Sequence, residues 1–170
     1  MRLEPLCRMT LRYTSSSWHQ PYGDRGDDSE WAGFGQGDGE VTGHVEGAVV
    51  WANYPRRRQD GVWTPNARGV IRTNDGEEIL LSFRGQSIHE QTETGYHRAI
   101  LARIELTTQA KPYRWLNTCF VVAEGEIDEE TEEIWLDLYV CLNEGAQGPP
   151  ALGAEAPEHF RQPARSDSAD

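Results

Sequence analysis

The sequence has few cysteines and no long apolar run. Its three cysteines, Cys7, Cys119 and Cys141, form no CxxC pair, so neither a disulfide framework nor a zinc site is indicated. No run of about 18 apolar residues is present to form a transmembrane helix. The N-terminal MRLEPLCRMTLRY lacks the apolar core of a signal peptide. We therefore expect a protein of the reducing, cytoplasmic compartment.

Basic residues are also scarce. The chain of 170 residues has 16 Lys and Arg against 28 Asp and Glu, a net charge of -12. This balance repels phosphate backbones and anionic lipid, so we expect neither nucleic acid nor membrane as a partner. The acidic runs at 24–40 and 124–137 lack the spacing of a calcium loop and are interpreted as solvated loops. No G-x-S-x-G motif supports a serine hydrolase.

What the sequence does contain is strand-like runs. Seven are separated by turn residues, and the T-N-D-G step after Arg72 is a strong hairpin signal. The pattern is typical of an all-β barrel or sandwich, and we predict a single closed antiparallel β-barrel of about eight strands over residues 1–143. A long loop is expected at 15–40, and a disordered tail rich in Pro, Ala and charge at 144–170. The runs span residues 3–13, 41–54, 62–73, 77–86, 96–108, 113–125 and 133–143.

Two pairs of polar residues are candidates for chemistry in the interior. Arg68 and Arg72 lie on one face of their strand, where guanidinium groups could clamp a carboxylate or carbonyl. The alternative is an outer face with salt bridges to the abundant acids. His44 and Glu46, two residues apart, could act as acid or base, or could lie on a polar surface. A metal site would need further ligands, and we predict none.

The stretch YRWLNTCFVVAEG is the most informative. If 113–125 is a strand, Tyr113, Trp115 and Asn117 share one face, and an amide beside a Trp fits a pocket wall. The alternative is equally open: Trp115 plugs the barrel end and Asn117 caps a neighbouring turn. The glycine-rich GFGQGDG at 33–39 has neither the preceding strand nor the following helix of a phosphate loop, so flexible glycine at a strand entry is the simpler interpretation.

Four segments together resemble the DUF3237 family, also called UPF0311. They are LEPL, GHVEG, NARGVIRTNDGEEI and YRWLNTCFVVAEGE, and the likeness covers about residues 3–142. The resemblance implies a β-barrel related to allene oxide cyclase and dirigent proteins, which hold a hydrophobic small molecule in the lumen without metal or organic cofactor. Two departures are evident: NARG replaces the usual DARY, and the rim near Trp51, Asn53 and Tyr54 is remodelled.

We therefore expect a small-molecule-binding barrel, with a cofactor-independent isomerase, cyclase or lyase as its enzymatic form. Asn117 and Arg68 would bind a carbonyl or enolate oxygen, and Glu46 or His44 would move a proton. The alternative is a non-catalytic ligand-binding or self-assembling protein, and we expect a homodimer or homotrimer. The residues expected to line the pocket are Trp115, Tyr113, Trp51, Tyr54, Asn53 and Arg72.

Overall fold

The structure is a computed structural model that describes residues 1–22, 30–92, 95–128, 130–143 and 156–160, without the side chains of 21–22, 90–97 and 158. These residues form ten strands and two short 3-10 helices. The elements are β1 (Arg2–Tyr22), β2 (Glu30–Gly43), β3 (Gly47–Asn53), β4 (Arg56–Arg57), β5 (Trp63–Thr64), β6 (Asn66–Thr73), β7 (Glu78–Thr92), β8 (Gly95–Thr107), η1 (Lys111–Thr118), β9 (Val121–Ile127), β10 (Glu133–Leu142) and η2 (Glu158–Phe160).

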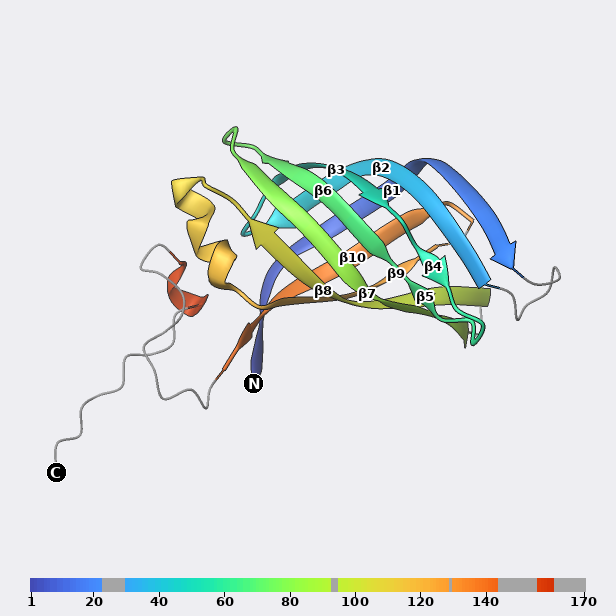
Figure 1. Cartoon of the computed structure of the whole chain (residues 1–170). Coiled ribbons are helices and arrows are strands. Elements are labelled where there is room, and N and C mark those ends of the chain that lie inside the picture. Colours follow the sequence, from blue (N-terminus) through green and yellow to red (C-terminus); the bar gives the residue numbers. More distant parts are fainter. Residues whose placement is uncertain (23–29, 93–94, 129, 144–155, 161–170) are drawn as a thin grey trace, which may run out of the picture.

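Eight of the strands pair into a ring. Antiparallel pairing runs from β1 through β10, β9, β8, β7, β6, β3 and β2 and returns to β1. The two-residue strands β4 and β5 bridge β2 to β7 at one end, and η1 lies at the other (Figure 1). The prediction of an all-β antiparallel fold is confirmed in this form. Among the described residues, no helix has the length and apolarity needed to span a membrane.

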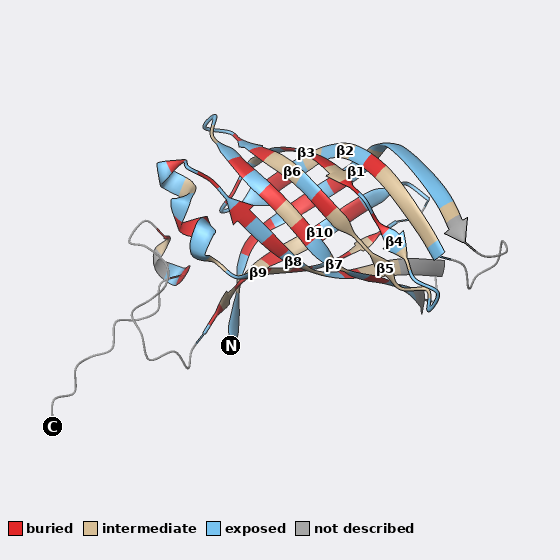
Figure 2. Ribbon diagram, in the orientation of Figure 1, coloured by how far each residue is buried: buried red, intermediate tan, exposed pale blue. Residues whose placement is uncertain are grey.

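The core lies inside the ring because side chains alternate along each strand. In β10 the inward residues Ile134, Leu136 and Leu138 are buried, whereas Trp135 between them is exposed on the outer face. The same alternation produces the red and pale bands that cross the strands in Figure 2. The turn after Arg72 is a hairpin as predicted, with Gly76 at φ 88°.

The long loop predicted at 15–40 is wrong for most of its length. β1 continues to Tyr22 and β2 begins at Glu30; residues 23–29 lie outside the described part. The reason is that alternate residues of GFGQGDG face inward, where they leave room for rings from β1. A Cβ added to Gly35 would lie 2.3 Å from the Tyr13 ring, and the ring of Trp18 covers Gly33 in the same way. These glycines therefore serve packing rather than flexibility.

A Gly35→Ala substitution should lower the free energy of unfolding by about 1–3 kcal/mol, because the new methyl group overlaps the Tyr13 ring and forces it aside. Urea denaturation measures the change. Gln36→Ala, on the exposed outer face of the same strand, is the control and should change stability by less than about 0.5 kcal/mol. Equal stability of the Gly35 variant and the wild type would show that the ring yields without cost.

The strand predicted at 113–125 is wrong in its first half. Residues 111–118 form the 3-10 helix η1, with Pro112 in its first turn, and β9 starts only at Val121. A 3-10 helix repeats every three residues, so the adjacent Trp115 and Leu116 are both buried while Asn117 is exposed. This segment is too short for its pattern to distinguish the two-residue repeat of a strand from the three-residue repeat of a 3-10 helix.

Part of the predicted tail packs on the same end of the ring. The ring of Phe160 is fully buried and stacks on Trp115, with centroids 5.1 Å apart and planes inclined by 27°. Ala156 is buried beside it. The disorder expected at 144–170 therefore does not describe 156–160; residues 144–155 and 161–170 lie outside the described part of the chain. Phe160, an aromatic residue in a polar segment, provides the apolar contact with Trp115.

Docking of this segment should weaken in acid. The His44 ring lies 4.4 Å from that of His159 and 5.2 Å from that of Phe160. Neighbouring groups partly remove His44 from water, and this desolvation, followed by the nearby His159, lowers the pKa of His44 below its usual 6.5. The undocked chain then binds the proton more readily. The stabilisation is therefore present above about pH 6.5 and is lost as pH falls through the lowered pKa.

Amide hydrogen exchange at Phe160, measured on both sides of this pH, tests the effect. Protection should decrease at the acid side in the wild type and should change less with pH in a His44→Gln variant. Protection that is independent of pH in the wild type would contradict the prediction.

Candidate functional site

The predicted arginine pair lies on the outer face of the ring. Arg68 and Arg72 are exposed on β6, while Ala67 and Ile71 between and beside them are buried. The Arg72 Nε donates to Glu78 on the adjoining strand β7 at 3.3 Å. This is the outer-face alternative weighed in the sequence, and the geometry gives neither residue access to the interior.

His44 and Glu46 do not share a strand face. The strand predicted across 41–54 is two strands, and residues 44–46 form the turn between β2 and β3. Both side chains are exposed, and Val45 between them is buried. The acid or base role predicted for either residue inside the barrel therefore has no support in this geometry.

Asn117 braces a turn outside the ring. Its Oδ1 accepts from the backbone N–H of Thr108 at 2.8 Å, and its Nδ2 donates to the Thr108 carbonyl at 2.9 Å. Trp115 covers the end of the ring, and the Tyr113 hydroxyl donates to Asp75 at 3.1 Å. These contacts match the plugging alternative, in which Trp115 closes the end of the ring and Asn117 holds a neighbouring turn. The oxygen-binding role of Asn117 stays a prediction that this position does not support.

A different group of side chains converges inside the opposite end of the ring, near β4 and β5. They enclose a cavity of about 30 Å³, which we call the chamber. Trp51 and Asn53 of the predicted site line it, both buried on the inner face of β3. Tyr54, the next residue, is 59% exposed and lies outside against Phe34. Aromatic rings form much of the wall: Tyr13, Trp18, Trp51, Trp63 and Phe83.

Tyr13 and Asn53 form a hydrogen bond in the wall of the chamber. The Asn53 Nδ2 donates to the Tyr13 oxygen at 2.9 Å, and its Oδ1 accepts from the backbone N–H of Asn66 at 2.9 Å. The amide is thus fixed at both ends, and the Tyr13 ring is held against Trp51 at 4.6 Å. Burial raises the pKa of Tyr13, although the Asn53 hydrogen bond and the Arg98 charge oppose this. At neutral pH the phenol therefore keeps its proton.

Two buried donors of the chamber lack hydrogen-bond partners among the described residues. They are the Trp63 Nε1 and the Ser87 Oγ. Arg98 extends from β8 with its guanidinium 4.9 Å from the centre of the Trp63 ring. Buried polar groups in native proteins are nearly always satisfied, so unpartnered ones need a physical reason such as water or a ligand. The chamber therefore has spare capacity to donate hydrogen bonds.

Sequence reasoning missed most of the chamber. Tyr13 was assigned to a half-buried strand, but Trp18, Trp63, Ser87 and Arg98 were not singled out. One signal was available: every second residue of 33–39 is glycine, and an inner face made of glycine must be filled by large side chains from neighbouring strands. The convergence of β1, β3, β5, β7 and β8 at one end depends on strand order and could not be seen.

No grouping of three or more His, Cys, Asp or Glu side chains suited to a metal occurs among the residues described. The segment GFGQGDG lies inside β2, paired to β1 and β3, rather than in a loop before a helix. It therefore has no phosphate-binding geometry. Burial raises the pKa of the Cys7 and Cys119 thiols to about 12, so neither is a thiolate at neutral pH.

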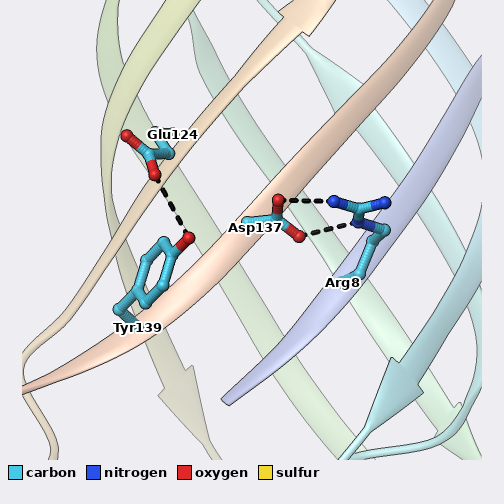
Figure 3. Close-up of polar contacts among 4 residues, drawn as sticks. All are labelled: Arg8, Glu124, Asp137 and Tyr139. Atoms are coloured by element: carbon cyan, nitrogen blue, oxygen red, sulfur yellow. Dashed lines mark hydrogen bonds and ion pairs between the residues drawn. The ribbon is translucent and has the colours of Figure 1, made fainter. Parts of the chain in front are cut away.

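The outer face has a larger but open hollow of about 410 Å³, lined by Leu3, Leu101 and Val122. Tyr139 and Glu124 also line it, and Tyr139 donates to Glu124 at 3.1 Å. Beside this pair, Arg8 donates twice to Asp137, at 2.7 and 2.6 Å (Figure 3). These groups satisfy one another on the surface. We place the site in the smaller chamber because two of its buried polar atoms, Trp63 Nε1 and Ser87 Oγ, have no hydrogen-bond partner among the described residues. The predicted homo-oligomer stays a prediction.

An antiparallel ring of eight strands around an apolar core defines a β-barrel-like protein. Residues 1–141 match the family described as "Protein of unknown function (DUF3237)", and the chain belongs to this family. The resemblance seen in the sequence is thereby confirmed. No curated protein matches the chain in sequence.

Solved structures share the fold. A beta-barrel-like protein from Acinetobacter baumannii is 17% identical with a TM-score of 0.67, covering 82% of this chain and 94% of its own. A conserved protein of unknown function from Rhodopseudomonas palustris is 16% identical with a TM-score of 0.67, covering 84% and 99%. An enzyme from Penicillium herquei is 22% identical with a TM-score of 0.58, covering 82% and 92%. At these identities the likeness extends to the fold alone.

Proposed function

We propose that the protein binds a small, partly aromatic molecule in the chamber and acts on it as a cofactor-independent isomerase, cyclase or lyase. The observation that carries the proposal is the pair of buried, unpartnered donors, Trp63 Nε1 and Ser87 Oγ, inside an aromatic wall. Ligand sites are typically apolar cavities in which a few placed polar groups fix orientation. The chamber has this composition.

Its volume of about 30 Å³ admits one small polar group. A larger ligand therefore has to displace a side chain, and Trp18 is the one in place to move. Its ring is 37% exposed and lies edge-on to Trp63 at 5.3 Å. Rotation of Trp18 outward would open the chamber and leave Trp63 in contact with the ligand.

Tyr13 is the group suited to proton transfer. Its oxygen accepts from Asn53, so its own hydrogen is free to be donated toward a ligand, and the raised pKa keeps that hydrogen in place. Donating it to a carbonyl oxygen, and recovering it at the end of the cycle, would assist an isomerisation or ring closure without a cofactor. The Penicillium herquei enzyme shares this fold, which is compatible with catalysis.

Filling the chamber should weaken binding. Small aromatic carbonyl compounds can be screened by the nuclear magnetic resonance signal of the Trp63 indole N–H, assigned with a Trp63→Phe variant. Ser87→Leu places an apolar side chain in the cavity and should weaken any hit by about tenfold or more. Ser82→Leu, which lies on the outward face of the same strand, is the matched control. Hits that Ser87→Leu leaves unchanged would locate binding elsewhere.

The rival function is a carrier or sensor that binds a ligand in the chamber without converting it. Both functions predict the same result in the binding experiment. They differ because a carrier or sensor would release the bound compound unchanged. Product analysis after prolonged incubation with stoichiometric protein separates the two.

A further inference from the structure

We infer that the protein forms a two-fold symmetric dimer through the outer face of β8, β9 and β10, in which each copy fills the outer hollow of the other. The occupant of the hollow is thus a second copy of this chain. The inference goes beyond the proposed function and does not depend on the chamber, which is lined by different residues inside the ring.

The hollow arises because one row of inward side chains is small. Gly85, Ala102 and Ala123 are aligned on β7, β8 and β9, and all three belong to the lining of the hollow. Ile100 and Ile104, the inward residues before and after Ala102, are large and buried. Strands with small inward side chains can bend toward the axis of the ring, so the outer surface is hollowed at this row, to about 410 Å³.

Apolar side chains surround the hollow on the outer face. Leu101 is 66% exposed and Leu3 is 47% exposed, and both line it. In the strand register, Val122 lies diagonal to Leu101 and directly opposite Tyr139, so the apolar surface continues across β8, β9 and β10. A contiguous apolar patch of this kind on a folded protein marks an interaction site.

A macromolecular partner fits this patch better than a small molecule. Ligand sites usually bury about 70–90% of the ligand surface, whereas a small ligand in this open hollow would leave much of Leu101 in water. The patch also holds ordered arginine and aromatic side chains, which are enriched in protein interfaces. The Arg103 guanidinium lies 5.2 Å from the centre of the exposed Phe120 ring, and the Tyr139 hydroxyl is held by Glu124.

The charge of the patch favours a second copy over a basic partner. The lining has one cation, Arg103, and one acid, Glu124, so it is neutral in net charge although the whole chain carries -12. Arg103 pairs with Glu105 at 2.9 Å, and Arg8 pairs with Asp137 beside the hollow (Figure 3). A neutral patch does not attract a basic protein. It does let two acidic copies meet, because exposed charges farther apart than about 10 Å are largely screened.

The projecting side chain and the hollow lie side by side on one face, which makes the face self-complementary. Leu101 projects from the patch at the edge of the hollow. A two-fold axis uses the same patch of both copies, so the Leu101 of each copy can enter the hollow of the other. Such a contact closes at two copies and buries both exposed leucines.

Sedimentation velocity of the full-length protein over a dilution series tests the inference. The wild type should have twice the mass of one 19.2 kDa chain. Leu101→Arg should raise the dissociation constant of the dimer by about 30-fold or more, the effect typical of a central interface side chain. Val50→Arg is the matched control. Val50 is 44% exposed on β3, on the opposite side of the ring, and its replacement should leave the dimer intact.

A wild type that stays a monomer at micromolar concentration would overturn the inference, even if the hollow then binds an apolar dye. An assembly of more than two chains, or a dimer that Leu101→Arg leaves intact, would overturn it as well. Circular dichroism verifies that each variant is folded. Should Leu101→Arg not fold, Leu3→Arg gives the same test from the other side of the hollow. The chamber residues are unchanged in all these variants, so the proposed function is tested separately.

Discussion

Replacing Trp115 with alanine will lower the free energy of unfolding by about 3–5 kcal/mol, the range for a buried large aromatic side chain. Trp115 is 5% exposed and is the part of η1 that covers the end of the ring. Its removal leaves a void over the core and takes away the ring on which Phe160 stacks. The C-terminal residues 156–160 should therefore lose their docking site together with the stability of the barrel.

Urea denaturation, followed by circular dichroism, measures the change. Trp135→Ala is the matched control: its ring lies on the outer face, is 39% exposed and contacts Arg8 at 5.6 Å, so a loss of less than about 1 kcal/mol is expected. A Trp115 variant as stable as the control would mean that η1 is an appendage and that the end of the ring is sealed without it.

Replacing Tyr13 with phenylalanine will lower turnover of the substrate by about 100-fold or more, if the proposed proton transfer is correct, because general acid catalysis contributes at least this much. The ring, its contact with Trp51 and its place over Gly35 are kept. Only the hydroxyl is lost, which leaves the Asn53 amide without its acceptor and costs about 1 kcal/mol of stability.

The pH profile gives a second measurement. Because burial raises the pKa of Tyr13, the protonated phenol and hence activity should persist to higher pH than for an exposed tyrosine, and should decline only in strong alkali. Tyr54→Phe, which removes a hydroxyl from a ring that is 59% exposed outside the chamber, is the control. Turnover in Tyr13→Phe close to that of the Tyr54 variant would exclude Tyr13 as the acid.

The candidate site shows what a single sequence could predict. Trp51 and Asn53 were placed at a pocket rim by the family resemblance, and both line the chamber. Asn117 and Arg68 were chosen because a polar residue on a strand suggests a pocket wall. That reasoning fails where the local structure is not a strand, as at Asn117, or where the face points outward, as at Arg68. Whether a strand face points inward or outward is decided only when the neighbouring strands are in place.

Arg98 and Ser87 illustrate the opposite error. Arg98 lies in a strand that was predicted, and Ser87 lies in a strand that was predicted too short. Nothing in the local pattern distinguishes the two from surface polar residues. They gain significance only because β7 and β8 bring them beside Trp63 of β5. The distance between these residues in the chain exceeds the reach of any local pattern.

The sequence alone determined the all-β class and the hairpin after Arg72, because alternation and turn residues act between near neighbours in the chain. It also determined membership of the family, which is recognised from sequence segments. The tertiary structure alone decided which faces point inward, which end is sealed by Trp115 and Phe160, and which side chains enclose the chamber. These depend on the closing pairs of the ring, such as β1 with β10, whose partners are separated by almost the whole chain.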